Sequence, residues 1–128
     1  MTMLRRLRDD ERGEATEAVL VTPVLLFLVM LVFQFGLWYH AEHVAQAAAQ
    51  EGVRTARLEG GSADDGQRRA TDFLARAGAK IVGDPVVSVT RNDETAVVEI
   101  RGQSVAVVPG MRIPIRARSE SPVERFRP

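Results

Sequence analysis

Few residues of this chain have the types and spacing that chemistry would need. His40 and His43 lie three positions apart with Glu42 between them, so on a helix they would share one face. A zinc site needs further ligands, and the HAEH string is not the two-turn HExxH pattern of zinc proteases. The serines lack the glycine elbow of a hydrolase nucleophile, and the sequence has no phosphate-binding loop. We therefore expect no enzymatic activity, no metal or other cofactor, and no small-molecule substrate.

Glu17 is the carboxylate whose position most needs an explanation, because a long uncharged segment begins directly after it. A carboxylate at the border of a hydrophobic segment is costly if it is drawn into lipid, so such residues commonly pair with a cation or a partner helix. The simpler alternative is a helix-start role, since an acidic residue near an N-terminus complements the helix dipole. The residues alone favour this second role.

The element that positions Glu17 is a predicted transmembrane helix over residues 18–39. These 22 residues contain no Asp, Glu, Lys or Arg, and as a helix they would extend about 33 Å, which matches the hydrocarbon thickness of a bilayer. Pro23 is expected to kink or loosen this helix about one turn from its start. Trp38 and Tyr39 close the segment with rings suited to the outer interface. The arginines of residues 1–17 predict that the N-terminus is cytoplasmic.

A cleaved secretory signal is an alternative interpretation of the same segment, because Ala45-Gln46-Ala47 has the small-x-small pattern of a signal peptidase site. The apolar segment is longer than the core of a usual signal peptide, however. The site also lies several residues beyond the aromatic boundary. We therefore favour an anchor.

The segment that follows predicts that the membrane helix continues outward to Leu58 as one rod. Residues 40–58 lack proline and are rich in alanine, glutamine and glutamate. Small residues recur along one side of this rod and would let another backbone approach closely. They are Ala41, Ala45, Ala49, Gly52 and Ala56.

The rest of the chain predicts a small α+β domain. A second helix is expected from its cap at Ser62 to Gly78, with Ala70, Phe73, Leu74 and Ala77 on its buried side. From Val87 the apolar residues alternate, which predicts an antiparallel meander of three or four strands, one of them over residues 103–108 and an edge strand around Pro114. Arg112, Arg116 and Arg118 would give that edge a charged row. The tail from Ser119 is expected to be frayed.

Composition limits the partners of such a protein. The chain has 17 basic and 17 acidic residues among 128 and no cysteine. Balanced charge gives no indication of nucleic-acid binding, and disulfides are excluded. The predicted organisation is a cytoplasmic leader over residues 1–17, a transmembrane helix over 18–39 and an extracytoplasmic α+β domain over 40–128.

A family resemblance covers mainly residues 12–58. The string RGEATEAVLVTPVLLFLVMLVFQFG, followed by the alanine-rich AAAQEGVR, resembles the TadE-like pilus assembly proteins of the tight-adherence type IV system. These proteins have a short basic leader, a glycine, a glutamate a few residues later, a proline six residues after that glutamate, and a single membrane helix. Glu17 and Pro23 keep the six-residue interval.

The resemblance implies a pseudopilin or minor pilin subunit, whose partners would be the membrane, sibling pilin or pseudopilin subunits, the assembly platform and a prepilin peptidase. It implies leader removal between Gly13 and Glu14, and a role for Glu17 in matching the new N-terminus of a neighbouring subunit. Glu17 is four residues after Gly13, where the family pattern has five. An uncleaved anchor, and a membrane-anchored extracytoplasmic interaction domain unrelated to pili, therefore remain the alternatives.

Overall fold

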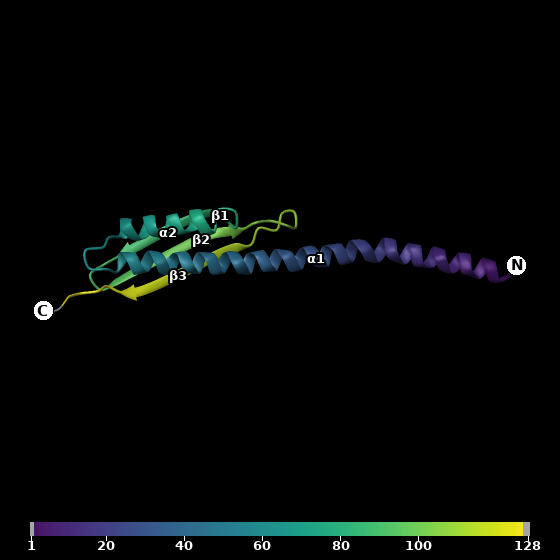
Figure 1. Ribbon diagram of the computed structural model, residues 1–128, viewed down its shortest axis with the longest axis horizontal. Helices are drawn as coiled ribbons and strands as arrows, with labels where there is room; N and C mark the ends of the chain where they lie inside the picture. The colour runs from purple at the N-terminus through teal and green to yellow at the C-terminus, as the bar shows by residue number, and fades with distance from the viewer. Residues whose placement is uncertain (1, 127–128) are drawn as a thin grey trace.

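One helix, α1, forms almost half of the chain. In the computed structural model, which describes residues 2–126, α1 runs from Thr2 to Ala56 without interruption (Figure 1). Its 55 residues extend over about 80 Å at the usual rise per residue. The helix includes the leader and continues through Pro23, and it ends two residues before the expected Leu58. The predicted rod is thus confirmed.

The second helix, α2, spans Ala63–Ala77 and begins and ends where its sequence signals predict. Ser62 is its N-cap, and the Ser62 hydroxyl accepts a hydrogen bond from the Asp65 amide at 3.1 Å. Gly78 is its C-cap. The buried side of α2 follows four-residue spacing through Gly66, Ala70 and Leu74. The expected place of Ala77 on that side is wrong, because Ala77 lies one residue off this spacing and is exposed.

Three antiparallel strands form the sheet, in the order β1-β2-β3: β1 is Val82–Arg91, β2 is Thr95–Ser104 and β3 is Pro114–Pro122. The Asn92 side chain closes the first hairpin by accepting hydrogen bonds from the amides of Glu94 and Thr95. On β2, Ala96, Val98 and Ile100 are fully buried, as their alternation predicts. The α+β fold class is therefore confirmed, with β3 as an edge strand.

The predicted strand over residues 103–108 is wrong. Residues 103 and 104 end β2, and residues 105–113 form the β2–β3 loop. The Ser104 amide donates to the Ile113 carbonyl at 2.9 Å, which closes the base of the loop. Within the loop, the backbone at residues 105, 107 and 108 bonds to a side chain of α1. An apolar string cannot form a strand where no neighbouring strand offers a ladder.

The expectation of a frayed tail from Ser119 is also wrong for much of that segment. Residues 119–122 continue β3 in register with β2. Beyond the strand, the Val123 amide donates to the Glu94 carbonyl and the Glu124 amide donates to the Arg57 carbonyl, both at 2.9 Å. The Arg57 and Glu124 side chains form an ion pair at 3.3 Å. These bonds tie the tail to the end of α1.

The second half of α1 and all of α2 pack on the same domain, α1 against β2 and β3, and α2 against β1. The two helices cross where Gly52 and Gly66 meet, since a Cβ added to Gly66 would lie 2.8 Å from both the Gly52 carbonyl oxygen and the Ala56 Cβ. The core consists of small and branched apolar residues from every element. The sheet and α2 therefore cover only the C-terminal half of the rod.

Candidate membrane and assembly segment

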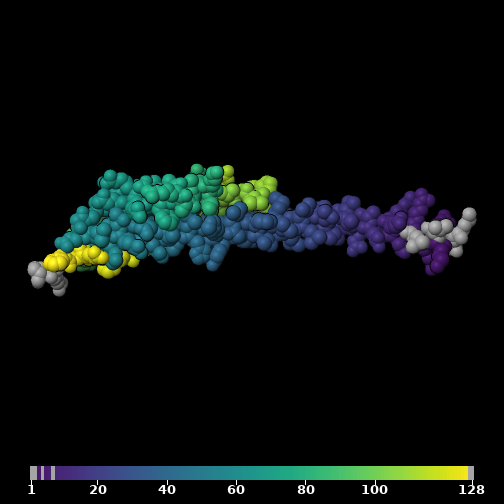
Figure 2. All heavy atoms as spheres, in the orientation of Figure 1, coloured from purple at the N-terminus to yellow at the C-terminus, as the bar shows by residue number. Residues whose placement is uncertain are grey.

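The N-terminal half of α1 projects from the domain as a bare apolar helix (Figure 2). Its large side chains are exposed on all sides. Within the part of the chain that the structure describes, α1 is the helix long and apolar enough to cross a membrane. A helix that is apolar all round needs lipid or a helix bundle to cover it. The exposed residues are Val19, Leu20, Val21, Val24, Leu25, Leu26, Phe27, Leu28, Val29, Val32, Phe33 and Phe35.

The residues expected to serve processing and assembly all lie on this projecting half and are exposed: Gly13, Glu14, Glu17 and Pro23. A Cβ added to Gly13 would meet no atom within 4 Å. Glu17 and Pro23 are six positions apart, which turns them by about 240° on a helix, so they face different directions. The structure thus presents these residues outward.

The Gly13–Glu14 peptide bond lies inside the helix, and the Thr16 hydroxyl donates to the Arg12 carbonyl at 2.8 Å across it. A peptidase generally needs its substrate extended, so cleavage here would require local opening of α1.

The stripe of small residues expected for helix packing lies on the C-terminal half of α1, which the domain covers. Ala41, Ala45 and Ala49 are fully buried, and Gly52 is buried with them. They face the protein's own α2 and sheet, where an added Cβ on Gly52 would lie 3.0 Å from the Ala70 Cβ and 3.3 Å from Val98. The stripe is occupied within the chain, which leaves the projecting half for contacts with other molecules.

Gln34 is the polar residue that the sequence reasoning missed. It interrupts the apolar segment, yet it is fully buried. Its amide nitrogen donates to the Val105 carbonyl at 2.9 Å and to the Ser104 hydroxyl at 3.3 Å. Its amide oxygen accepts from the amides of Val107 at 2.7 Å and Val108 at 3.2 Å. Gln34 therefore fastens the β2–β3 loop to α1. The sequence signal for this role is an uncharged polar side chain inside an apolar helix, since such side chains commonly hydrogen-bond to a neighbouring segment.

Two further side chains attach α1 to the edge of the sheet. The Trp38 indole donates to the Pro114 carbonyl at 3.4 Å, and Gln46 donates to the Arg118 carbonyl at 3.1 Å. Trp38 is half-buried against the core. Together with the Gln34 bonds, these contacts are spread along α1 from the β2–β3 loop to the middle of β3. We therefore treat α1 and the domain as one body.

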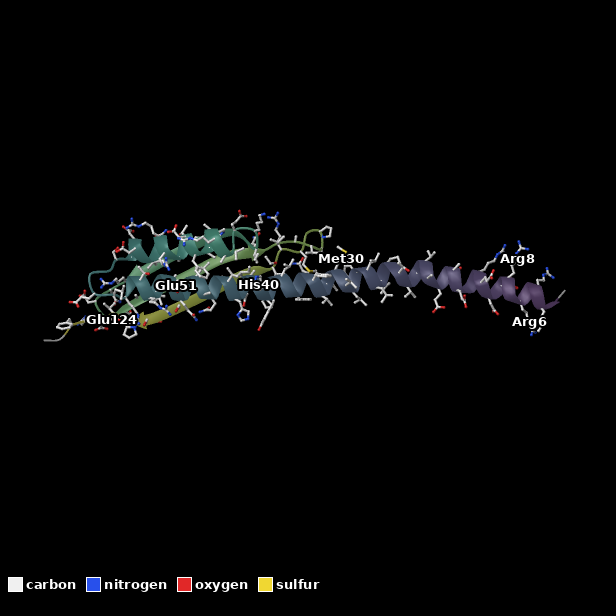
Figure 3. All side chains as sticks on the ribbon, viewed as in Figure 1. Arg6, Arg8, Met30, His40, Glu51 and Glu124 are labelled. Carbon is white, nitrogen blue, oxygen red and sulfur yellow. The ribbon has the colours of Figure 1, made fainter. Side chains whose placement is uncertain are left out.

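The two histidines lie on the exposed side of α1 (Figure 3 labels His40). The His43 ring makes an edge-to-face contact with Tyr39, with centroids 4.4 Å apart. Across the described residues, no group of three or more His, Cys, Asp or Glu side chains is placed to hold a metal ion. The geometry thus gives His43 an aromatic contact.

Comparison with known proteins adds one positive result. A family model described as TadE-like protein matches residues 14–54. This segment is similar to the TadE-like family. The match lies entirely within α1 and spans about a third of the chain, so it contains the exposed apolar half, Glu17 and Pro23, and confirms the resemblance. No curated protein and no solved structure matches the chain.

The TadE-like segment divides into two stretches with different surroundings. From residue 14 to about residue 33 it is mostly exposed, whereas from residue 41 to residue 53 its inner side is covered by α2 and the sheet. The small domain lies outside the match. The similarity to the TadE-like family therefore covers part of α1, and the domain is attached to the C-terminal half of that helix.

Proposed function

We propose that this protein is a pseudopilin or minor pilin subunit that acts in the assembly of a tight-adherence pilus. The TadE-like segment supports an association with such a pilus. In this role the helix resides in the membrane with its N-terminus in the cytoplasm, and the domain lies outside. The projecting helix then moves from lipid into a bundle of sibling helices in a surface filament or its assembly platform.

The observation that carries the proposal is the bare apolar stretch of α1 that begins directly after Glu17. Its apolar side chains are exposed on all sides, and the domain folds without covering them. A surface of this kind suits both lipid and a bundle of like helices, since both are apolar. Inside a bundle, the Glu17 carboxylate would be stable when it meets a cation, such as the N-terminus of a neighbouring subunit, and that pairing would set the axial register.

Replacement of Glu17 tests the register role. We expect Glu17→Ala and Glu17→Gln to reduce the amount of the protein that purifies with pilus components by about tenfold or more, because breaking a buried ion pair costs roughly 3–5 kcal/mol. Glu11→Ala is the control, since Glu11 is an exposed carboxylate on the same helix, outside the apolar segment. The measurement is immunoblotting of sheared pili and of membrane fractions from a deletion strain that expresses each variant.

An unchanged co-purification of both Glu17 variants, at normal membrane levels, would contradict the register role. The mature N-terminus, read by mass spectrometry, separates the wider alternatives. A chain that starts at Glu14 supports processing by a prepilin peptidase, and an intact leader supports a permanent anchor. An intact leader together with a normal membrane level in cells without pilus machinery would favour an interaction domain unrelated to pili.

A further inference from the structure

The β2–β3 loop, residues 105–113, extends from the sheet toward the N-terminus of α1 and lies along the apolar part of the helix (Figure 1). Its first seven residues, VAVVPGM, contain no polar side chain. Val105 is 40% exposed, and Ala106, Pro109 and Gly110 are exposed as well. An exposed apolar loop of this kind is costly in water and indicates a partner.

Several polar backbone groups at the base and in the middle of the loop are satisfied by other groups of the protein. Gln34 supplies bonds to the carbonyl of Val105 and the amides of Val107 and Val108. The Met111 amide donates to the Val108 carbonyl at 3.0 Å, and the Ile113 amide donates to the Ser104 hydroxyl at 3.2 Å. Irregular backbone is tolerated at membrane depth only where other protein groups satisfy it. Gln34 and the loop satisfy one another in this way.

The position of the loop along α1 decides its surroundings. Met30 and Leu31 are half-buried, although Val29 and Val32 on either side are exposed. Figure 3 draws Met30 beside the tip of the loop. The protein therefore begins to cover α1 at Met30, nine residues before the apolar segment ends at Tyr39.

The length of the apolar segment then places the loop in the bilayer. If the loop stayed in water, residues 18–29 alone would cross the hydrocarbon, and twelve helical residues reach only about 18 Å of the roughly 30 Å required. The helix cannot slide outward to gain length, because Glu17, Glu14 and Arg12 would enter the lipid. Placing residues 18–37 in the hydrocarbon sets the loop tip about 10 Å below its outer boundary.

We propose that the β2–β3 loop inserts into the outer leaflet of the bilayer that α1 spans, so that the domain is seated in the membrane at a second point. The exposed residues of the loop, Val105, Ala106, Pro109 and Gly110, contact the acyl chains. Arg112, which is exposed just beyond them, reaches the lipid phosphates. Among the described residues Arg112 makes no ion pair within the protein, whereas Arg118 farther along β3 pairs with Glu99 and Glu120. This proposal needs α1 to span a membrane but does not depend on the pilus role.

Single cysteines test the insertion directly, because the natural chain has none. Ala106→Cys and Val105→Cys would each be labelled with the fluorophore NBD, and the full chain would be reconstituted into phosphatidylethanolamine–phosphatidylglycerol vesicles that contain doxyl-labelled phosphatidylcholine. We expect the NBD emission at both positions to fall by about half or more through the doxyl lipid and to resist aqueous iodide, because these positions lie at acyl-chain depth. Asp93→Cys, in the exposed β1–β2 turn, is the matched control and should show the opposite behaviour.

Each other result overturns the proposal. Quenching of the loop labels by iodide to the same extent as the Asp93 label would place the loop in water. Shielding from both quenchers would show that another protein copy covers it. The circular dichroism spectrum of each labelled variant, compared with that of the natural chain, verifies that the helix and the domain are folded before quenching is measured.

Discussion

At the residue scale, Gln34 connects the two parts of the molecule. In the sequence it is a polar residue within a hydrophobic segment. In the structure it is fully buried and makes four hydrogen bonds to residues some seventy positions away. No local pattern could predict those partners, because the loop that supplies them is fixed only once β2 and β3 pair. Glu17 differs, since its position at the edge of the apolar segment was sufficient to single it out.

Replacing Gln34 by leucine should free the β2–β3 loop. The variant keeps the side chain's approximate size but leaves the Val107 and Val108 amides and the Val105 carbonyl without this partner, and unsatisfied buried groups cost about 1–3 kcal/mol each. We expect Gln34→Leu to speed hydrogen exchange at the Val107 and Val108 amides more than tenfold in detergent micelles, while exchange at Val98 in β2 stays slow. Mass spectrometry or NMR of the exchanging protein measures this.

Val32→Leu is the control for Gln34→Leu, since Val32 is 73% exposed on the same stretch of helix. Its loop amides should exchange as in the natural chain. If the amides of Val107 and Val108 were equally protected with leucine at position 34, the hydrogen bonds of Gln34 would not be what holds the loop.

At the element scale, local signals predicted the helices and the first hairpin well. Ser62 and Gly78 mark the ends of α2, and Asn92 closes the β1–β2 turn. The proline-free composition of residues 40–58 predicts that the membrane helix continues as a long rod. The sequence-based predictions were wrong where a bonding partner far away in the sequence decides the local structure. Residues 105–108 have strand-like composition but bond to α1, and residues 119–122 look like a polar tail but have β2 beside them. The small-residue stripe was recognised, but the sequence could not say that its own α2 would cover it.

The crossing of α1 and α2 gives a prediction about packing. Gly66→Ala would place a Cβ 2.8 Å from both the Gly52 carbonyl oxygen and the Ala56 Cβ, neither of which is the flexible end of a side chain. The helices would have to separate, and overpacking of this kind costs about 1–3 kcal/mol. Because alanine improves helix propensity by about 1 kcal/mol, we expect a net loss of up to about 2 kcal/mol. Thermal unfolding in detergent, followed by circular dichroism, measures it.

Gly36→Ala is the matched control, because a Cβ at Gly36 meets no atom within 4 Å. It should leave the unfolding temperature unchanged or raise it slightly. A Gly66→Ala protein as stable as the Gly36→Ala protein would show that the two helices do not need their close approach.

At the scale of the whole molecule, the rod and the domain form one body. Gln34, Trp38 and Gln46 fasten α1 to the loop and the edge of the sheet, and Glu51, labelled in Figure 3, contacts Arg69 of α2 at 3.6 Å. A displacement of the helix along its axis would therefore displace the domain equally. A subunit that is drawn from a bilayer into a filament requires this coupling. The same role requires the two ends of α1 to lie on opposite sides of the membrane.

Cysteine labelling tests that orientation in the absence of any natural cysteine. The arginines of the leader predict that Asp10→Cys is cytoplasmic and that Asp93→Cys is outside. Both positions are exposed in the folded protein, so a difference in labelling reports the side of the membrane and not burial. The labelling is done in spheroplasts of cells without a prepilin peptidase, so that the leader with position 10 is retained. A membrane-impermeant maleimide should label Asp93→Cys there and should label Asp10→Cys only after the membrane is permeabilised. The reverse pattern would place the domain in the cytoplasm. Labelling of both sites in intact spheroplasts would mean that α1 does not span the bilayer, and it would also contradict the insertion of the β2–β3 loop into the outer leaflet.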